Sequence, residues 1–259
     1  MRRDRIYANS SPFKKLQILA GHRPGACPNT MTEPFHKFPH TPHLLWLGDG
    51  APREDKVLTP GEVAAFLTGE LIIEEKVDGA NMGLSLGPDG RVRAQSRGNY
   101  LAPGRCHAQW NPLWPWLAER RGLLEGALQG GLMLFGEWCH ARHTVPYDAL
   151  PDWFLGFDIF EPAMNRFWSV DRRNALLPEC GLVHIPEVRR GRITLKQIPT
   201  LLVQSAVGRV PMEGLYFRRE RDGLLEARAK VVSAGFKQQI EEHWTRRGVT
   251  PNQRLEVAA

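Results

Sequence analysis

Hydrophobic positions along this chain form short runs and alternations that predict strands more often than helices. Residues 71–77, 132–138 and 153–160 contain apolar runs of strand length, which are typical of buried strands. Residues 81–86 and 91–95 predict two more strands, joined by a turn at Pro88-Asp89-Gly90. Further along, 212–219 and 224–232 predict another pair around Asp222-Gly223.

Four segments predict helices instead: 113–129, 170–177, 195–205 and 233–247. Strands outnumber these helices and come as hairpins. We therefore predict an α+β fold, with antiparallel β-sheets and flanking helices.

Both ends of the chain lack a sustained period. Residues 1–30 predict a disordered basic extension, and Met31 offers a second plausible start. Residues 249–259 predict a disordered tail. The predicted catalytic domain is therefore 31–248.

Charge is distributed unevenly. The chain has a formal net charge of +6, yet residues 1–30 hold six basic side chains against one acidic. Those residues supply +5, so the other 229 carry about +1, and the total does not establish a basic surface for nucleic acid. Four cysteines without a CxxC pair fit a reducing cytoplasm. No apolar run approaches the roughly 20 residues of a membrane span.

The sharpest chemical feature is Lys76-Val77-Asp78-Gly79-Ala80-Asn81. A lysine that ends an apolar strand lies at a sheet edge, where desolvation and neighbouring charge can activate its amine as a nucleophile. An ordinary strand-end lysine before a turn is the competing interpretation. The short motif alone does not decide between them.

Later segments add groups that suit a nucleotide. Arg97 follows a strand and can fork onto phosphate oxygens. Glu137 and Glu213 are carboxylates in otherwise apolar strands, where an unpaired charge is costly. Phe157 is a strand aromatic able to stack on a purine. Arg228 and Lys230, two residues apart, share one strand face. Two cations beside two carboxylates suit a nucleoside triphosphate with Mg²⁺.

The segments KVDGAN, SRG, FGEW, GFDIF, MEGLYFR and RAKVV occur in this order between Lys76 and Val232. This ordered set resembles the covalent nucleotidyltransferase superfamily of RNA ligases, DNA ligases and capping enzymes, and is most similar to the phage-type RNA ligase 2 group. The resemblance implies a nucleotidyltransferase (adenylation) domain that uses ATP with Mg²⁺ or Mn²⁺. It also implies RNA partners with 5′-phosphate and 3′-hydroxyl ends, a nicked duplex among them, in RNA repair with a partner protein.

The resemblance also implies a role for each matched residue. Lys76 resembles the nucleophile that takes AMP from ATP. Glu75, Asn81 and Arg97 resemble residues that contact the ribose and phosphate, and Glu137 and Glu213 resemble those that contact the ribose and the metal ion. Phe157 resembles the aromatic residue that stacks on the adenine, and Lys230 the lysine that binds the α-phosphate. Asp158, on the opposite strand face from Phe157, is expected to support the site from behind.

Two departures from the family pattern stand out. Arg228 occupies the place of a usual lysine and replaces a point donor with a planar fork. We nevertheless predict that it acts in catalysis beside Lys230. The second departure is that short phage-type RNA ligases usually carry an extra C-terminal domain, which we do not expect here because only 29 residues follow Lys230. These residues are also too few for the OB-fold that accompanies DNA ligases and capping enzymes, which favours an RNA ligase.

Three hypotheses remain at this point. The first is an ATP-dependent RNA ligase, and the second is an enzyme that seals nicked DNA. The third is a non-catalytic or partner-dependent nucleotide-binding module. Retention of Lys76, Glu137, Glu213 and Lys230 together favours an enzyme. A metal site at Cys139, His140 and His143 lacks a second ligand cluster, so we interpret these histidines as packing or surface residues.

Overall fold

The computed structural model describes residues 35–48, 56–234, 236 and 248–255. Backbone contacts divide the chain into one unit of residues 1–36 and a second of residues 37–259. Everything below concerns the second unit. None of its described helices is both long and apolar enough to cross a membrane.

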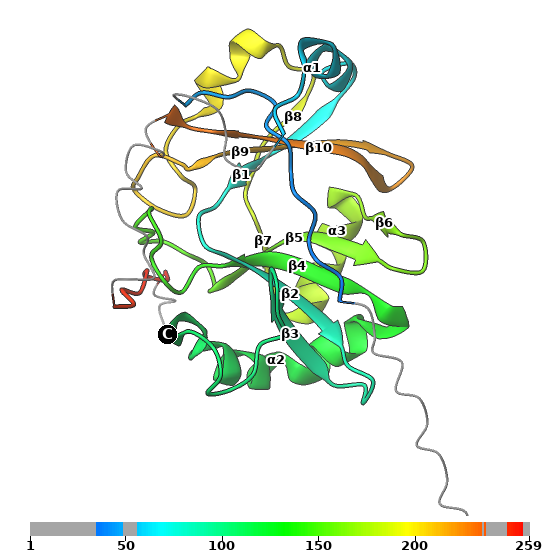
Figure 1. Cartoon of the computed structure of the whole chain (residues 1–259), viewed down its shortest axis with the longest axis vertical. Helices are drawn as coiled ribbons and strands as arrows, with labels where there is room; N and C mark the ends of the chain where they lie inside the picture. Colours follow the sequence, from blue (N-terminus) through cyan, green and yellow to red (C-terminus); the bar gives the residue numbers. More distant parts are fainter. Residues whose placement is uncertain (1–34, 49–55, 235, 237–247, 256–259) are drawn as a thin grey trace, which may run out of the picture. The chain divides into compact units, whose positions relative to one another are not determined.

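One sheet has four antiparallel strands in the order β10-β9-β1-β8 (Figure 1). Its strands are β1 (Leu71–Lys76), β8 (Glu187–Gly191), β9 (Gly214–Arg221) and β10 (Leu224–Val232). Asp222 and Gly223 both have positive φ angles, 52° and 73°, which closes β9 onto β10 in a tight turn. Helix α1 (Pro60–Phe66) and two short 3₁₀ turns, η4 (Leu195–Gln197) and η5 (Pro199–Leu201), cover the apolar face of this sheet.

The second sheet has the order β3-β2-β4-β5-β6, and β7 pairs in parallel with β5. Its strands are β2 (Ala80–Leu86), β3 (Val92–Ser96), β4 (Met133–Trp138), β5 (Phe154–Glu161), β6 (Arg166–Phe167) and β7 (Val183–His184). The associated helices are α2 (Leu113–Ala127), α3 (Val170–Leu176), η1 (Ala108–Trp110), η2 (Gln129–Gly131) and η3 (Leu177–Cys180).

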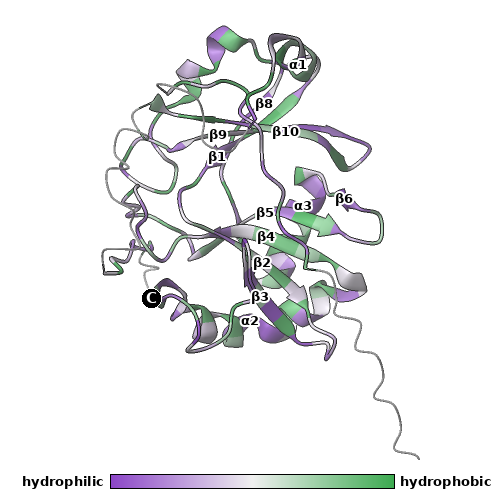
Figure 2. Cartoon of the chain, viewed as in Figure 1, coloured by the Kyte–Doolittle hydropathy of each residue, from purple (hydrophilic) through white to green (hydrophobic). Residues whose placement is uncertain are grey.

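Helix α2 supplies much of the core beneath the second sheet. Its Leu113, Trp116 and Leu124 pack against Met82, Leu84 and other buried residues of the strands. Apolar and polar turns alternate along α2, as expected of a helix with one buried face (Figure 2). The opposite face of this sheet is therefore left to form the site.

A buried network of charges joins the two sheets. Arg218 of β9 binds Asp158 of β5 at 2.6 Å, and Arg173 of α3 binds Glu74 of β1 at 2.5 Å. All four side chains are fully buried. Both arginines also donate to the backbone carbonyl of Phe157. The network therefore fixes the position of Phe157 between the sheets.

Most predicted elements are confirmed, including every predicted strand and the helices at 113–129 and 170–177. The prediction of one helix over 195–205 is wrong, because this stretch forms the two 3₁₀ turns η4 and η5. Pro199 has no N–H to continue a helical ladder. Helix α1 was not predicted, although Thr59 and Glu62 form a capping box at its start. The predicted helix over 233–247 lies largely outside the described residues.

The prediction of a disordered tail from residue 249 is wrong for residues 250–255, which we term the C-terminal strap. Pro251 and Arg254 form β-bridges with Ala141 and Leu150. Asn252 accepts the backbone N–H of Tyr147 at 3.0 Å and donates to the carbonyl of Cys139 at 2.8 Å. The sequence of this segment is polar and has no apolar pattern that would predict packing. It is held instead by hydrogen bonds of a buried amide side chain, that of Asn252.

Candidate active site

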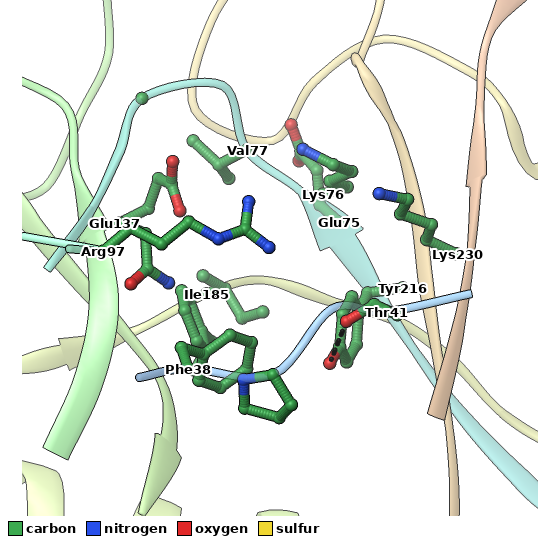
Figure 3. Close-up of a pocket in the computed structure, with 14 residues that line it drawn as sticks. Phe38, Thr41, Glu75, Lys76, Val77, Arg97, Glu137, Ile185, Tyr216 and Lys230 are labelled. Carbon is green, nitrogen blue, oxygen red and sulfur yellow. Dashed lines mark hydrogen bonds between the residues drawn. The ribbon is translucent and has the colours of Figure 1, made fainter. Parts of the chain in front are cut away.

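A cavity of about 310 Å³ lies between the two sheets. Charged groups from four strands or strand ends converge on it (Figure 3). Its lining residues are Phe38, Pro39, Thr41, Glu75, Lys76, Val77, Gly79, Asn81, Arg97, Glu137, Phe157, Ile185, Tyr216 and Lys230. The cavity thus brings together all the predicted site residues except Glu213 and Arg228.

Lys76 ends β1 and points into this cavity (Figure 3). Its Nζ lies 2.6 Å and 2.7 Å from the two carboxylate oxygens of Glu213. Glu213 immediately precedes β9, whose Gly214 pairs with Lys76. A Cβ atom on Gly214 would lie 2.1 Å from the carbonyl oxygen of Val231, so only glycine lets β10 approach here. Glu213 is therefore positioned as the direct partner of the lysine.

The turn after Lys76 is held by contacts with a distant loop. Asp78 accepts the backbone N–H groups of Thr144 and Val145 at 2.7 and 2.9 Å. Its own N–H donates to the hydroxyl of Tyr147 at 2.8 Å. A Cβ on Gly79 would lie 2.7 Å from the backbone oxygen of Trp138, so this turn needs glycine. The aspartate and glycine of the motif thus hold the turn, and only the lysine is left for chemistry.

The carboxylates around Lys76 have strongly shifted pKa values. Burial raises the pKa of Glu137 to about 8 and that of Glu213 to about 7, although the charge of Lys76 opposes both shifts. Burial disfavours the ammonium of Lys76, but the charges of Glu213 and Glu137 outweigh it and raise the pKa of the lysine. In this state Lys76 is an ammonium group, and the carboxylates are poised to accept a further positive charge.

These two carboxylates fit a divalent cation. They are buried oxygen donors beside one lysine, and burial, which raises their pKa values, disfavours their charged forms unless further positive charge is bound. Over the described part of the chain, no group of three or more His, Cys, Asp or Glu side chains is placed to hold a metal ion alone. Mg²⁺ is commonly bound by one or two carboxylates together with substrate phosphates. Glu137 and Glu213 match that incomplete donor set.

The opposite end of the cavity is apolar. Phe38 lies there, away from Lys76, and Ile185 lies between Phe38 and the charged end (Figure 3). The ring of Phe38 meets that of Phe157 edge-on, with centroids 5.1 Å apart. One end of the cavity is therefore charged and the other is hydrophobic.

Lys230 and Arg97 reach the cavity from different sheets (Figure 3). Lys230 lies on β10, where its backbone exchanges hydrogen bonds with Pro42 and Leu44 of the segment that carries Phe38. Arg97 directly follows β3 and is exposed to solvent. These two cations approach the charged end from both sides, together with the amide of Asn81.

Arg228 does not line the cavity, so its predicted catalytic role has no geometric support. Its guanidinium binds Asp158 at 2.9 Å and lies 3.9 Å over the ring of Phe167. Although Arg228 and Lys230 are two residues apart on one strand, the network of Asp158 holds the arginine aside. Asp158 is fully buried behind Phe157, as predicted.

Glu75 lines the cavity, but its carboxylate is already bonded elsewhere. Ser205 donates to it at 2.5 Å and the N–H of Ala206 at 2.9 Å. Burial raises the pKa of Glu75. This residue therefore fixes the loop at 205–206 against β1.

Several lining residues were missed by the sequence analysis. Phe38 and Thr41 lie in an irregular segment that carries no periodic signal. Tyr216, whose hydroxyl lies 3.3 Å from that of Thr41, sits two residues after Gly214 and shares its strand face. The alternation of strand faces, which places Tyr216 on the same face as Gly214, could have predicted that Tyr216 lies at the site. Ile185 follows the two-residue strand β7, which is too short to predict.

The histidines after β4 behave as packing residues. His143 contacts the side-chain oxygen of Gln109 at 3.0 Å, and the ring of His140 packs edge-on against Trp153.

Two antiparallel sheets around a lysine-bearing cavity define the class of this protein, a fold shared with RNA ligase nucleotidyltransferases. The family model described as RNA ligase matches residues 69–232, and the chain belongs to that family. Membership in the phage-type RNA ligase 2 group stays a prediction.

Solved structures of the Naegleria gruberi RNA ligase have a similar fold. The structure with PPi is 23% identical, with a TM-score of 0.54, covering 67% of this chain and 52% of that chain. A point variant with ATP and Mn is 19% identical (TM-score 0.53; 70% and 55% covered). Another, with AMP and Mn, is 19% identical (TM-score 0.56; 79% and 58% covered). This chain thus spans about half the length of these structures. No curated protein matches it.

Proposed function

We propose that this protein is an ATP-dependent RNA ligase that forms a covalent lysyl-AMP intermediate at Lys76. The observation that carries the proposal is the contact of Lys76 with Glu213 inside a cavity that also holds Glu137 and Lys230. Family membership supports RNA as the polynucleotide. The Naegleria gruberi ligase structures with ATP and Mn support the nucleotide and the divalent metal.

In the first step, the neutral amine of Lys76 attacks the α-phosphorus of ATP. A P–N bond forms, the bond to the bridging oxygen breaks, and pyrophosphate leaves with the electron pair. The amine loses its proton to form the phosphoramidate. A 5′-phosphate oxygen of RNA then displaces Lys76 from AMP, and a 3′-hydroxyl displaces AMP to form the phosphodiester. Such transfers depend on positioning and charge stabilisation.

The residues around Lys76 divide the remaining work. Lys230 and Arg97 are placed to bind the phosphates from two sides. Glu213 holds the lysine in position while it is charged. Glu137 and Glu213 would hold a divalent cation, which would supply positive charge to stabilise the phosphates and lower the pKa of Lys76. The charges of Glu213 and Glu137 raise the pKa of Lys76, so neutralisation of those carboxylates would favour release of the lysine proton.

The apolar end of the cavity suits the adenine. Phe157 and Ile185 provide aromatic and aliphatic surface at that end, and Phe38 closes it beside them. Thr41 and Tyr216 add hydroxyl groups at the rim. A nucleotide with its base at this end places its phosphates among Lys76, Lys230 and Arg97.

Sealing of nicked DNA and a role as a non-catalytic module remain the alternatives. An enzyme is favoured over a binding module because Lys76, Glu213, Glu137 and Lys230 meet at one place. RNA is favoured over DNA because of the family match. A cytoplasmic role in RNA repair and a repair partner protein stay predictions.

Transfer of label from ATP tests the proposal. The protein, freed of bound AMP, is incubated with α-labelled ATP and Mg²⁺, denatured and examined for covalent label. We expect label that disappears in Lys76→Ala and persists in the control Lys196→Ala, which removes an exposed lysine of η4. Absence of label on folded protein would contradict the proposal that the protein is an ATP-dependent ligase. Label from GTP alone would move the assignment to capping chemistry.

A further inference from the structure

The wall of the cavity formed by Asn81 and Arg97 continues outward along the hairpin of β2 and β3 (Figure 1). In register, Gly83 pairs with Gln95 and Ser85 with Arg93. The alternate residues of both strands pack beneath α2. Strand alternation therefore places Arg93 and Arg97 on the same face, about 13 Å apart at the usual rise per residue.

This hairpin is locally basic. Residues 80–105 contain Arg91, Arg93, Arg97 and Arg105 against the single acid Asp89, a net charge of +3. The 229 residues after residue 30 total about +1, so the rest of them carry about −2. Arg91 and Arg93 belong to the hairpin and Arg97 and Arg105 follow it, so this part of the chain is more basic than the rest of those 229 residues, and its Arg97 lines the cavity.

Two side chains at the edge of the hairpin are held in place against each other. The guanidinium of Arg93 lies 4.4 Å over the ring of Tyr100, and its Nε donates to the hydroxyl of Ser85 at 3.1 Å. Tyr100 is a large aromatic residue that keeps 40% of its surface exposed. A held cation loses little side-chain freedom on binding a phosphate, and an exposed aromatic ring can stack on a base.

We propose that the outer face of the β2–β3 hairpin, from Arg97 through Arg93 to Tyr100, binds the RNA strand whose end enters the cavity. This inference rests on the proposed function and adds the path of the polynucleotide. Because backbone phosphates carry the negative charge, the surface binds RNA largely irrespective of its sequence.

The test compares two double variants that remove the same charge. R91A/R93A changes the hairpin, and R189A/R192A removes two exposed arginines at the other sheet's edge strand. The probe is a fluorescent single-stranded RNA with a 5′-phosphate, and its affinity is measured by anisotropy across a series of salt concentrations. We expect R91A/R93A to weaken binding about tenfold at low salt and to reduce the salt slope by about 1. R189A/R192A should match the wild type.

Covalent labelling by ATP provides the second readout, because it needs no RNA. R91A/R93A should label as the wild type does, which also shows that the variant is folded. Equal RNA affinity and salt slope in the two double variants would overturn the proposal. An acidic peptide serves as a second probe. If R91A/R93A weakened binding of this peptide but not of RNA, the proposal would also be overturned, and the face would be assigned to a protein partner. If wild-type protein fails to label, the proposed function fails, while the binding assay still tests the hairpin.

A Tyr100 series tests stacking separately from charge. Tyr100→Ala should weaken RNA binding without changing the salt slope, whereas Tyr100→Phe keeps the ring and should bind nearly as the wild type does. Equal affinity of both variants and the wild type would remove Tyr100 from the proposed path.

Discussion

Two clusters of charged side chains in this molecule are built in part from consecutive residues of β1. Glu74 joins the network of Arg173, Arg218 and Asp158, in which carboxylates bind arginines directly. Glu75 and Lys76 line the cavity, where carboxylates gather around the lysine and keep raised pKa values. The first cluster joins the two sheets. The second holds carboxyl groups with raised pKa values in a cavity, a combination typical of functional sites.

The comparison predicts its largest effect at Arg218. Arg218→Ala leaves Asp158 buried without its closest partner, which should lower the free energy of unfolding by about 3–5 kcal/mol. The matched control is Arg219→Ala, one residue along β9, whose side chain is partly exposed and pairs with Glu226. That variant should lose about 1 kcal/mol or less. Urea unfolding measures both, and similar losses would show that the network is not the junction.

Glu213→Gln should affect chemistry more than folding. The substitution removes the charged partner of Lys76 and one ligand of the proposed cation, so the rate of lysyl-AMP formation should fall about 100-fold. We expect the urea midpoint to change little. Single-turnover labelling with ATP measures the rate, and Glu226→Gln, at an exposed position of β10, is the control. An unfolded variant, or an unchanged rate, would contradict a catalytic role.

Glu137→Gln should make the protein more stable than the wild type, by an amount that grows as pH rises. The folded protein holds the proton of Glu137 up to about pH 8, whereas the unfolded chain releases it near the ordinary pKa of 4.5. Wild-type stability is therefore lost progressively between those pH values, and glutamine avoids this loss. At about 1.4 kcal/mol per pKa unit, the variant should gain on the order of 5 kcal/mol at pH 8. Near pH 4.5 the difference should vanish. Thermal or urea unfolding at both pH values checks this, and a constant difference would contradict it.

The smallest effect is expected at Arg228. Arg228→Lys keeps the charge near Asp158 but loses the planar contact with Phe167, which should destabilise the protein by about 1 kcal/mol. Labelling by ATP should stay within about threefold of the wild type, because Arg228 lies outside the cavity. A large change in labelling without a change in stability would restore the catalytic prediction.

Much of the site could be predicted because its chemistry lies on regular strands. Lys76, Glu137 and Phe157 sit on β1, β4 and β5, where apolar runs and alternation place each side chain. Phe38 could not be predicted, because its segment is irregular and is held by β10 and by rings of the second sheet. The position of Arg228 outside the lining of the cavity could not be predicted, because alternation gives the face of a strand but not the partner, here Asp158, that binds a side chain.

Stability and reactivity also differ in which distant segments they need. The arginine network uses residues between Glu74 and Arg228 alone, whereas Asp78 beside the nucleophile depends on the loop containing Tyr147. That loop is in turn bonded by Asn252, 105 residues further along the chain.

The support of the turn after Lys76 therefore depends on the C-terminal strap, a segment near the end of the chain. The strands of both sheets end at Val232, and because a chain is made from its N-terminus, the segment around Asn252 is synthesised after all of them. The turn of Asp78 receives its last supports only afterwards. A nascent chain is thus expected to complete the strands of both sheets first and the support of the turn after Lys76 last.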